Sequence, residues 1–555
     1  MENSSSQHLS DGAIPNGSLV DDRPIHWLAS QLFKVEWNPL VENRRFKPME
    51  GHLELFNEHV NGTDETWKRL YFRTKDGRFQ WFASHCADEH PISDLLLTGT
   101  TISANKEAWT MQIRGGKEDA NVVVRVPSNV FEKWHQALLS HASSSLVDAY
   151  IQPTWPPVPH RKNRVVLLEL GRHAISAGVL TQKPSLPYSF FPTLCAVGSS
   201  NKNGQQKVVT CGANAFNEHQ THGWQLKRPI EFKNDDGEVV EFDDDVLKAV
   251  LNKALLSDAA AQAQAMDISF RPQDYLILLA IPHSLALRAA SELVKMLLNT
   301  AQFGFKGVTV VRQPTLVLYS YDVTTGVVVD LGEQLSIVPV IDEFVVDDAI
   351  KMAHFGAPQI REQMLKGIGD DLQKMLDIFG NGSDNDDATI QLLLRYIVEK
   401  SCYVAADGIE EERAKGIKDE LVEFVGQHSL KVNGELRFMA PEGLFRPQLW
   451  GLEMPALHRM VHEAIQKCPI DSRRMLYRNV YLTGGTSLLR GLAERLEHEL
   501  AQLAPASVLV QVLNSPWRRH STFLGSHSIA ASEDFEKCCV NGMNLAEYLS
   551  RIDGE

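Results

Sequence analysis

The chain lacks the cysteine patterns of disulfide scaffolds and zinc sites. It has seven cysteines, an odd number, among 555 residues. No two of them form a Cys-x-x-Cys motif, and the closest pair is the adjacent Cys538 and Cys539. This usage argues against a structural zinc site and predicts a reducing compartment.

Long apolar runs and an excess of positive charge are also missing. The longest apolar segments, such as YLILLAI at 275–281, are far shorter than the ~20 residues that cross a bilayer. No transmembrane segment is therefore expected, and the polar start of the chain carries no secretory signal. The net charge of −15 disfavours direct binding to nucleic acid.

The pattern along the chain divides it into four parts. Residues 1–23 are rich in Ser, Asn and Asp, which predicts a disordered tail. Residues 24–146 contain short strands separated by turn signals and followed by one helix, which predicts a small, mostly antiparallel barrel or sandwich. Residues 147–163 contain four prolines and predict a semi-rigid linker. Residues 164–550 alternate apolar strands with helices, which is typical of an α/β domain with parallel sheets.

The front part resembles a pleckstrin-homology domain. The WKRLYF stretch at 67–72, the strand order and a terminal helix with Trp134 carry this resemblance. It implies that Trp134 packs in a core and that Lys68 and Arg69 are candidate lipid contacts. Acidic residues such as Glu58 and Asp64 in the neighbouring loop would repel phosphates. Phosphoinositide binding is therefore disfavoured, and a protein-docking role is favoured.

The second part resembles actin and actin-related proteins over residues 164–546. The resemblance implies two related halves, each with a five-stranded sheet, that close over a cleft holding ATP and a divalent ion. The fold class expected for the chain is thus a front β-domain followed by a two-lobed α/β actin-like ATPase fold. The blocks that match in order are LKRPIEF (226–232), QPTLVLYSYDVTTGVVVDLG (313–332), EKSCYVA (399–405), APEGLFRP (440–447) and KCPIDSRRMLYRNVYLTGGTSLLRGLAERL (467–496).

The first phosphate loop of the family is altered in this chain. Glu169 takes the position of a strand-end Asp that contacts the metal through water, and Gly171 is kept. Ser176 replaces the lysine that contacts phosphate, which removes a contact of about 1.5–3 kcal/mol. Arg172 and His173 stand where small residues are usual. The Arg172 side chain either restores positive charge or blocks the loop by its bulk.

The second phosphate loop is also altered. Asp330 and Gly332 match the family, and Asp330 is a further candidate for contact with the metal through water. The second glycine of the motif is missing, the hairpin is one residue shorter, and Ser336 falls at the position of a histidine that orders water. A shorter loop redirects the amides that would face phosphate.

The rest of the cleft is better kept. The resemblance implies ATP with Mg²⁺ as cofactor, with an intact adenosine side and a damaged phosphate side, so that turnover is disfavoured. Gln313 matches the residue that positions the attacking water. The other matching positions are Gly484, Gly485 and Thr486 in the Gly-Gly turn, and Arg395, Glu399 and Arg519 near the base and ribose.

Self-assembly into filaments is disfavoured. The segment SSNKNGQQKV at 199–208 is short and polar where actin has a contact loop with an apolar tip. We therefore expect a non-filamentous scaffold or adaptor subunit of a cytoskeletal complex in the cytoplasm, whose partners are protein subunits including actin or actin-related proteins. The alternatives are a nucleotide-switched ATPase, a subunit of a nuclear chromatin-remodelling complex, and a lipid-targeted adaptor.

Overall fold

The computed structural model describes most of the chain between residues 24 and 554. The expected tail at 1–23 and the expected linker at 147–163 lie outside the described residues. The described ranges are 24–35, 49–57, 66–75, 78–83, 91–97, 100–115, 120–142, 164–181, 185–199, 207–232, 240–379, 387–515 and 517–554.

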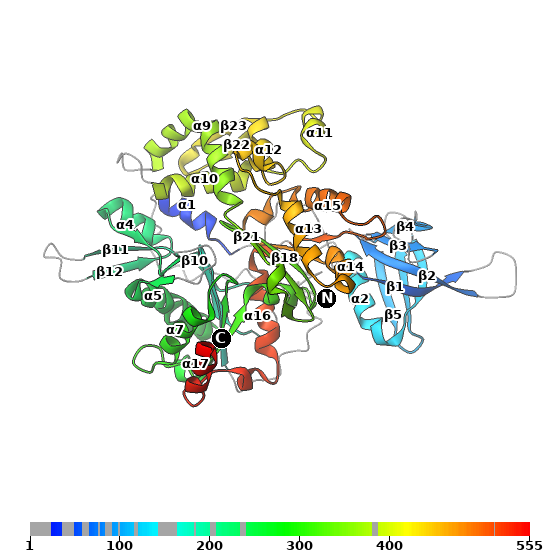
Figure 1. The fold of residues 1–555 in the computed structure, drawn as a ribbon, viewed down its shortest axis with the longest axis horizontal. Coiled ribbons are helices and arrows are strands. Elements are labelled where there is room, and N and C mark those ends of the chain that lie inside the picture. Colours follow the sequence, from blue (N-terminus) through cyan, green and yellow to red (C-terminus); the bar gives the residue numbers. More distant parts are fainter. Residues whose placement is uncertain are drawn as a thin grey trace, which may run out of the picture.

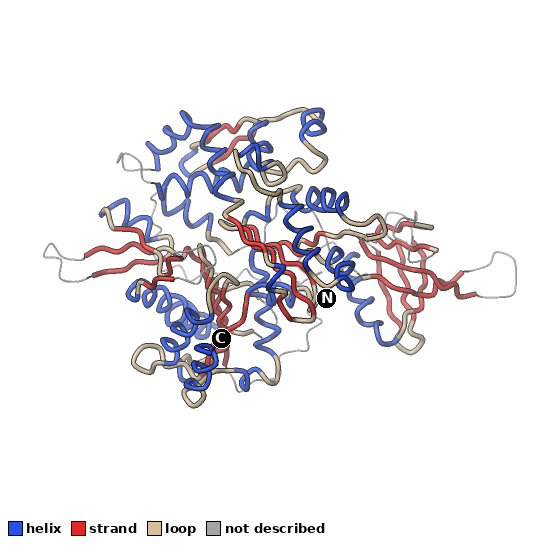
Figure 2. Tube along the Cα trace, viewed as in Figure 1, coloured by secondary structure: helices blue, strands red, loops and turns tan. Residues whose placement is uncertain are grey.

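Seven described strands of the front domain form one antiparallel sheet in the order β4-β3-β2-β1-β7-β6-β5. The recorded pairings leave β4 and β5 as edges, so the sheet is open and the expected closed barrel is not confirmed. Figure 2 shows these strands as a group apart from the central sheets. Their bounds are β1 Glu50–Asn57, β2 Thr66–Lys75, β3 Arg78–Phe82, β4 Ser93–Leu96, β5 Thr100–Asn105, β6 Thr110–Gly115 and β7 Ala120–Arg125.

One helix, α2 (Phe131–Ala142), packs on this sheet. Its Trp134 side chain is 1% exposed and contacts the Phe79 ring edge-to-face at 6.1 Å. The prediction that Trp134 is a core residue is therefore confirmed. An ion pair between Glu50 and Arg478 of α14 (Ile470–Arg478) joins the front domain to the second part of the chain.

Helix α1 (Pro24–Leu32) does not pack with the front sheet, although we expected residue 24 to begin that domain. Its buried residues, at helical spacing, are Ile25, Leu28, Ala29 and Leu32. This apolar stripe needs an apolar partner, and it finds one in the core of the second part of the chain.

The first lobe of the second part is built on the sheet β10-β9-β8-β16-β17. Strands β8, β16 and β17 are parallel, and every residue of β16 is buried. Alternate β16 side chains enter two different cores, so the expected burial of its two faces is confirmed. The sheet is mixed rather than wholly parallel, because β9 runs antiparallel to β8 and to β10. The bounds are β8 Arg164–Leu170, β9 Ala174–Val179, β10 Ser189–Pro192, β16 Tyr275–Ile281 and β17 Gly307–Arg312.

A small sheet extends the first lobe. It has the order β12-β11-β13 and carries helix α4 (Asn214–His222). The end of the chain also joins this lobe, because Val540 pairs with Val308 and α17 (Leu545–Gly554) contacts α7 (Leu287–Leu298). The small sheet has the bounds β11 Cys195–Ser199, β12 Lys207–Cys211 and β13 Gln225–Lys227.

The second lobe is built on the sheet β20-β19-β18-β24-β25, with β21 added beside β19. Strand β18 runs parallel to β24 and antiparallel to β19. Helices α9 (Ala357–Phe379) and α10 (Asp387–Ser401) share the large core of this lobe. The bounds are β18 Gly326–Leu331, β19 Leu335–Ile341, β20 Phe344–Val345, β21 Lys351–Ala353, β24 Val480–Thr483 and β25 Val512–Leu513.

Two helices cross where the lobes meet, because α8 (Gln313–Tyr319) contacts β17 of the first lobe and β18 of the second, and α16 (Ser521–Ala531) packs against α8. Helices α8 and α16 pack so closely that a Cβ at Gly525 would lie 1.7 Å from the Leu316 carbonyl oxygen. The crossing joins the two sheets at the base of the cleft between them. Among the helices that the structure describes, none is long and apolar enough to cross a membrane.

Candidate functional site

The site is a cleft of about 710 Å³ between the two lobes. The turn between β8 and β9, the turn between β18 and β19, and the turn after β24 all open into it. Because these turns follow the carboxyl ends of central strands, the two sheets direct them toward one another. The predicted cleft residues all line it, namely Glu169, Gly171, Gln313, Asp330, Gly332, Arg395, Glu399, Gly484, Gly485, Thr486 and Arg519.

Two carboxylates lie at the strand ends deep in the cleft. The pKa of Glu169 is raised to about 7, mainly by burial and to a smaller extent by the nearby charge of Asp330, while hydrogen bonds from Ser176 and Thr522 oppose the rise. Burial likewise raises the pKa of Asp330 to about 6. The Glu169 Oε2 atom accepts no hydrogen bond from the described residues. Both groups therefore retain protons more readily than exposed carboxyls do.

The β18–β19 turn places a third carboxylate in the cleft. Both oxygens of Glu333 accept hydrogen bonds from Arg361 of α9, at 2.6 and 2.5 Å. Burial alone would raise the pKa of Glu333, but the hydrogen bonds and charge of Arg361 outweigh it and lower the pKa. The Arg361 charge is thus already compensated within the chain. Sequence reasoning missed Arg361 because it comes from a helix after the motif.

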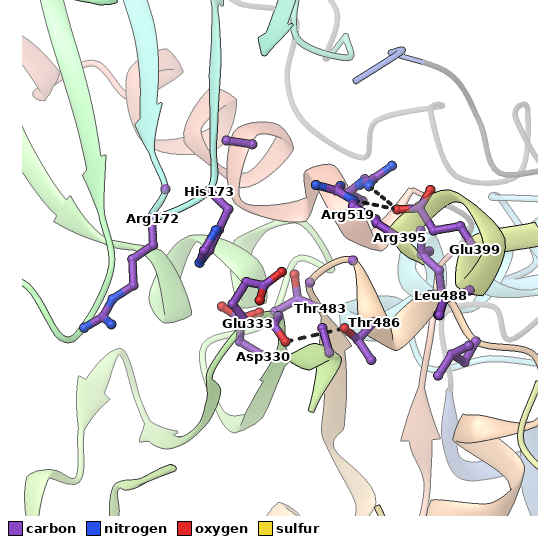
Figure 3. Close-up of a pocket in the computed structure, with 18 of the residues that line it drawn as sticks. Arg172, His173, Asp330, Glu333, Arg395, Glu399, Thr483, Thr486, Leu488 and Arg519 are labelled. Carbon is purple, nitrogen blue, oxygen red and sulfur yellow. Dashed lines mark hydrogen bonds and ion pairs between the residues drawn. The ribbon is translucent and has the colours of Figure 1, made fainter. Parts of the chain in front are cut away.

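The β8–β9 turn does not supply the missing cation. Burial lowers the pKa of His173 to about 3, so this ring is neutral near pH 7. Figure 3 shows the Arg172 guanidinium pointing away from Asp330 and Glu399. The orientation of Arg172 therefore does not support the role in which its charge replaces that of the lysine that the family has at the position of Ser176.

A second charge cluster lies in the part of the cleft where the resemblance places the adenosine of ATP. Arg395 and Arg519 each donate to the same Glu399 oxygen at 3.0 Å (Figure 3). Burial would raise the pKa of Glu399, but the two arginines reverse this and lower it. Their guanidinium groups also lie over aromatic rings, Arg395 over Phe33 at 4.8 Å and Arg519 over Phe190 at 5.4 Å.

The first glycine of the Gly-Gly turn is required by the close approach of the neighbouring strand β18. Gly484 has φ +85°, and a Cβ there would lie 2.3 Å from Asp330 Oδ1 and 2.4 Å from the Leu331 carbonyl oxygen. Gly485 is different, because a Cβ there would come no closer than 3.7 Å to Arg519. Gly484 is thus required by the strand beside it, whether or not a ligand approaches.

The turn also lacks an α-helix at its end. Thr486 opens a short 3₁₀ helix, Thr486–Leu488, and α15 (Leu492–Leu503) begins four residues after that segment ends. The N-terminus of α15 therefore does not lie at Gly484 and Gly485, where it could have favoured an anion.

The candidate lipid residues lie far from the cleft, on strand β2. Lys68 and Arg69 are exposed and stand opposite Leu55 and Glu54 in the register with β1. Glu54 also forms an ion pair with Arg125 at 3.0 Å. The acidic loop that follows β1 lies outside the described residues.

The comparison with known protein families concerns the part of the chain that forms the two lobes. The family model for actin matches residues 160–548, well over half of the chain. The chain belongs to the actin family. The cleft of this actin-family protein lies where its two lobes meet, as the resemblance implied.

Two relatives are similar to part of this chain. A protein of Neurospora crassa named "Actin-like protein" is 34% identical over 236 residues, which cover 41% of this chain and 59% of that protein. A protein of Schizosaccharomyces pombe named "Centractin" is 29% identical over 273 residues, which cover 48% of this chain and 69% of that protein. The match thus spans less than two thirds of the Neurospora protein.

The residues present fit ATP with magnesium poorly. Glu169 and Asp330 line the cleft and could face a hydrated cation, since Mg²⁺ bound to a nucleotide needs only one or two protein carboxylates. The adjoining loop presents the Glu333 carboxylate, which would repel a triphosphate. Several charged side chains that line the cleft are therefore already paired with one another.

Proposed function

We propose that this protein is a non-filamentous scaffold or adaptor subunit of a cytoskeletal complex, with a degraded nucleotide cleft. The supporting observation is that charged side chains in the cleft form two sets of ion pairs with one another. Glu333 pairs with Arg361, and Glu399 pairs with Arg395 and Arg519. Groups that would contact a ligand's phosphates, ribose and base are engaged by neighbouring side chains. A ligand would have to break these pairs before it could bind.

In this proposal the cleft does not hydrolyse ATP, and the groups at the expected position of the attacking water support this part of it. The Gln313 amide donates to the Leu170 carbonyl oxygen at 3.4 Å, and Ser336 stands where the family has a histidine. A serine hydroxyl near neutral pH is a weak base. Hydrolysis requires finer placement of water than binding does, and these residues offer no such placement.

The front domain acts as a docking arm of the pleckstrin-homology type in this proposal. The strand order with β1 between β2 and β7, and the closing helix with buried Trp134, support that type. Its ligand in the proposal is a protein surface, because Arg69 stands opposite Glu54 and Lys68 opposite the apolar Leu55, which makes a poor cluster of cations for a phosphate.

The relative named "Centractin" supports a cytoskeletal complex in this proposal. The proposed location is the cytoplasm, with the nucleus as the alternative. The proposed partners are protein subunits, with actin or actin-related proteins among them. Affinity purification of the full-length chain followed by mass spectrometry identifies them, and recovery of chromatin-remodelling subunits instead would favour the nuclear alternative.

The proposal predicts that the full-length protein stays soluble under conditions that polymerise actin. The polar segment at 199–208 offers little apolar surface for a subunit contact. High-speed sedimentation in Mg²⁺, KCl and ATP, with actin as the positive control, measures this. Pelleting of this protein alone in an ATP-dependent manner would contradict the proposal and favour a nucleotide-switched filament.

A further inference from the structure

Helix α1 contacts both lobes at the open side of the cleft. It packs against α4 of the first lobe and against α9 and α10 of the second lobe. Figure 1 shows α1 between α4 and α10, with the front domain at the opposite end of the molecule. A segment from the start of the chain therefore bridges two parts that would separate if the cleft opened.

The bridge is apolar and well packed. Ile25, Leu28 and Ala29 are fully buried, and Leu32 is 1% exposed. They belong to one core cluster that also contains Phe216 of α4 and Leu393 of α10. The small sheet of the first lobe is thus joined to the second-lobe core through α1.

Aromatic contacts continue the bridge beyond the helix. Trp27 meets Tyr396 of α10 edge-to-face at 5.5 Å. Phe33 contacts Phe190 of β10 in the first lobe at 5.7 Å, and the Arg395 guanidinium of the second lobe lies over the Phe33 ring. Gln31 and Lys34 line the cleft itself. Residues 31–34 therefore cover part of the cleft entrance.

A direct polar contact also joins the lobes beside α1. The side-chain amide of Gln220 on α4 donates to the Phe379 carbonyl oxygen at 2.6 Å and to Thr389 Oγ1 at 3.1 Å. This contact forms only when α4 lies against the ends of α9 and α10. It fixes the same closed arrangement that α1 bridges.

We propose that residues 24–34 are an intramolecular strap that holds the two lobes closed and covers the entrance of the cleft. The charged side chains of the cleft are paired with one another. The strap supplies the contact between the lobes that a bound ligand would otherwise make. The inference deepens the proposed function by naming what controls access to the same cleft. It rests on the contacts of residues 24–34 and of Gln220, and it does not require that the cleft be unable to bind nucleotide.

The strap is suited to release as a unit. A helix of nine residues is not stable in isolation, so its order depends on docking against both lobes. Loss of docking should free the segment and loosen the lobe contact together.

Hydrogen exchange of the full-length protein, read by mass spectrometry, tests the strap. Leu28→Asp places a charge at a buried contact of α1. We expect exchange in α4 and in the loops at 171–173 and 332–334 to become about tenfold faster or more. The core strands β8 and β18 should keep their protection. Ser30→Ala is the control in the same helix, because Ser30 is only partly buried and its hydroxyl donates only within α1, so exchange in α4 and in both loops should stay unchanged.

The strap is overturned if Leu28→Asp frees residues 24–33 while α4 and both cleft loops exchange at the original rates. If that variant does not fold, Phe33→Ala removes the ring between Phe190 and Arg395 without burying a charge. Faster exchange of the cleft loops in Phe33→Ala supports the strap, and unchanged exchange overturns it. Nucleotide binding by the same variants is measured separately and bears on the proposed function only.

Discussion

Replacing Arg495 by alanine is expected to lower the free energy of unfolding by about 3–5 kcal/mol. Arg495 on α15 has a side chain 4% exposed and pairs with Glu442, which is fully buried, at 3.1 Å. It also donates to Glu499 at 2.7 Å and to the Ala405 carbonyl oxygen at 2.8 Å. Burial raises the pKa of Glu442 even with Arg495 beside it, so the variant would leave a buried carboxylate without its main partner.

Urea-induced unfolding followed by circular dichroism measures the Arg495→Ala effect. Arg459→Ala is the matched control, because Arg459 lies exposed on the adjacent helix α13 (Leu457–Lys467) and should change stability by no more than about 0.5 kcal/mol. Equal effects of the two substitutions would show that the buried pair does not support the second lobe.

Glu169→Gln is expected to stabilise the protein by about 2–3 kcal/mol at pH 8 and to have little effect near pH 4.5. The folded-state pKa of Glu169 is raised to about 7, so the folded protein retains this proton after the unfolded chain has lost it. The contribution of Glu169 to stability is therefore fully present below the unfolded pKa and is lost as pH rises toward about 7. Glutamine removes that loss because it does not titrate.

The difference in unfolding free energy between wild type and variant, measured from pH 4.5 to pH 8, isolates this group from other titrations. Glu292→Gln on the exposed surface of α7, where Glu292 pairs with Lys295, should give a difference that is small and independent of pH. A resident divalent cation would lower the Glu169 pKa and reverse the sign. Destabilisation by Glu169→Gln at pH 8 would therefore show that the ionised carboxylate is needed.

The sequence predicted those features that depend on neighbours along the chain. The continuous apolar run at Tyr275–Ile281 predicted a strand covered on both faces, and this is confirmed. The motif around Asp330 placed its carboxylate at a strand end in the cleft, where the structure also has it. Trp134 at helical spacing with other apolar residues indicated a core position, and its side chain is buried.

The sequence could not predict contacts between segments far apart in the chain. Arg361 reaches Glu333 from α9, and Phe33 reaches Arg395 from more than three hundred and fifty residues earlier. Helix α1 was not predicted, because residues 24–146 were assigned as one unit to the front domain and the partner of α1 lies in the second part of the chain. The reason for Gly484 was also hidden, since it depends on how closely β18 and β24 approach.

Thermal denaturation of the full-length protein with and without ATP and Mg²⁺ is the most direct test of a cleft whose charges are compensated internally. We expect no shift in the melting temperature at about millimolar ATP, because Glu333, Arg361, Arg395 and Arg519 are engaged with one another or with Glu399. Actin serves as the positive control. A saturable rise in melting temperature that requires both ATP and Mg²⁺ would contradict the closed and compensated cleft.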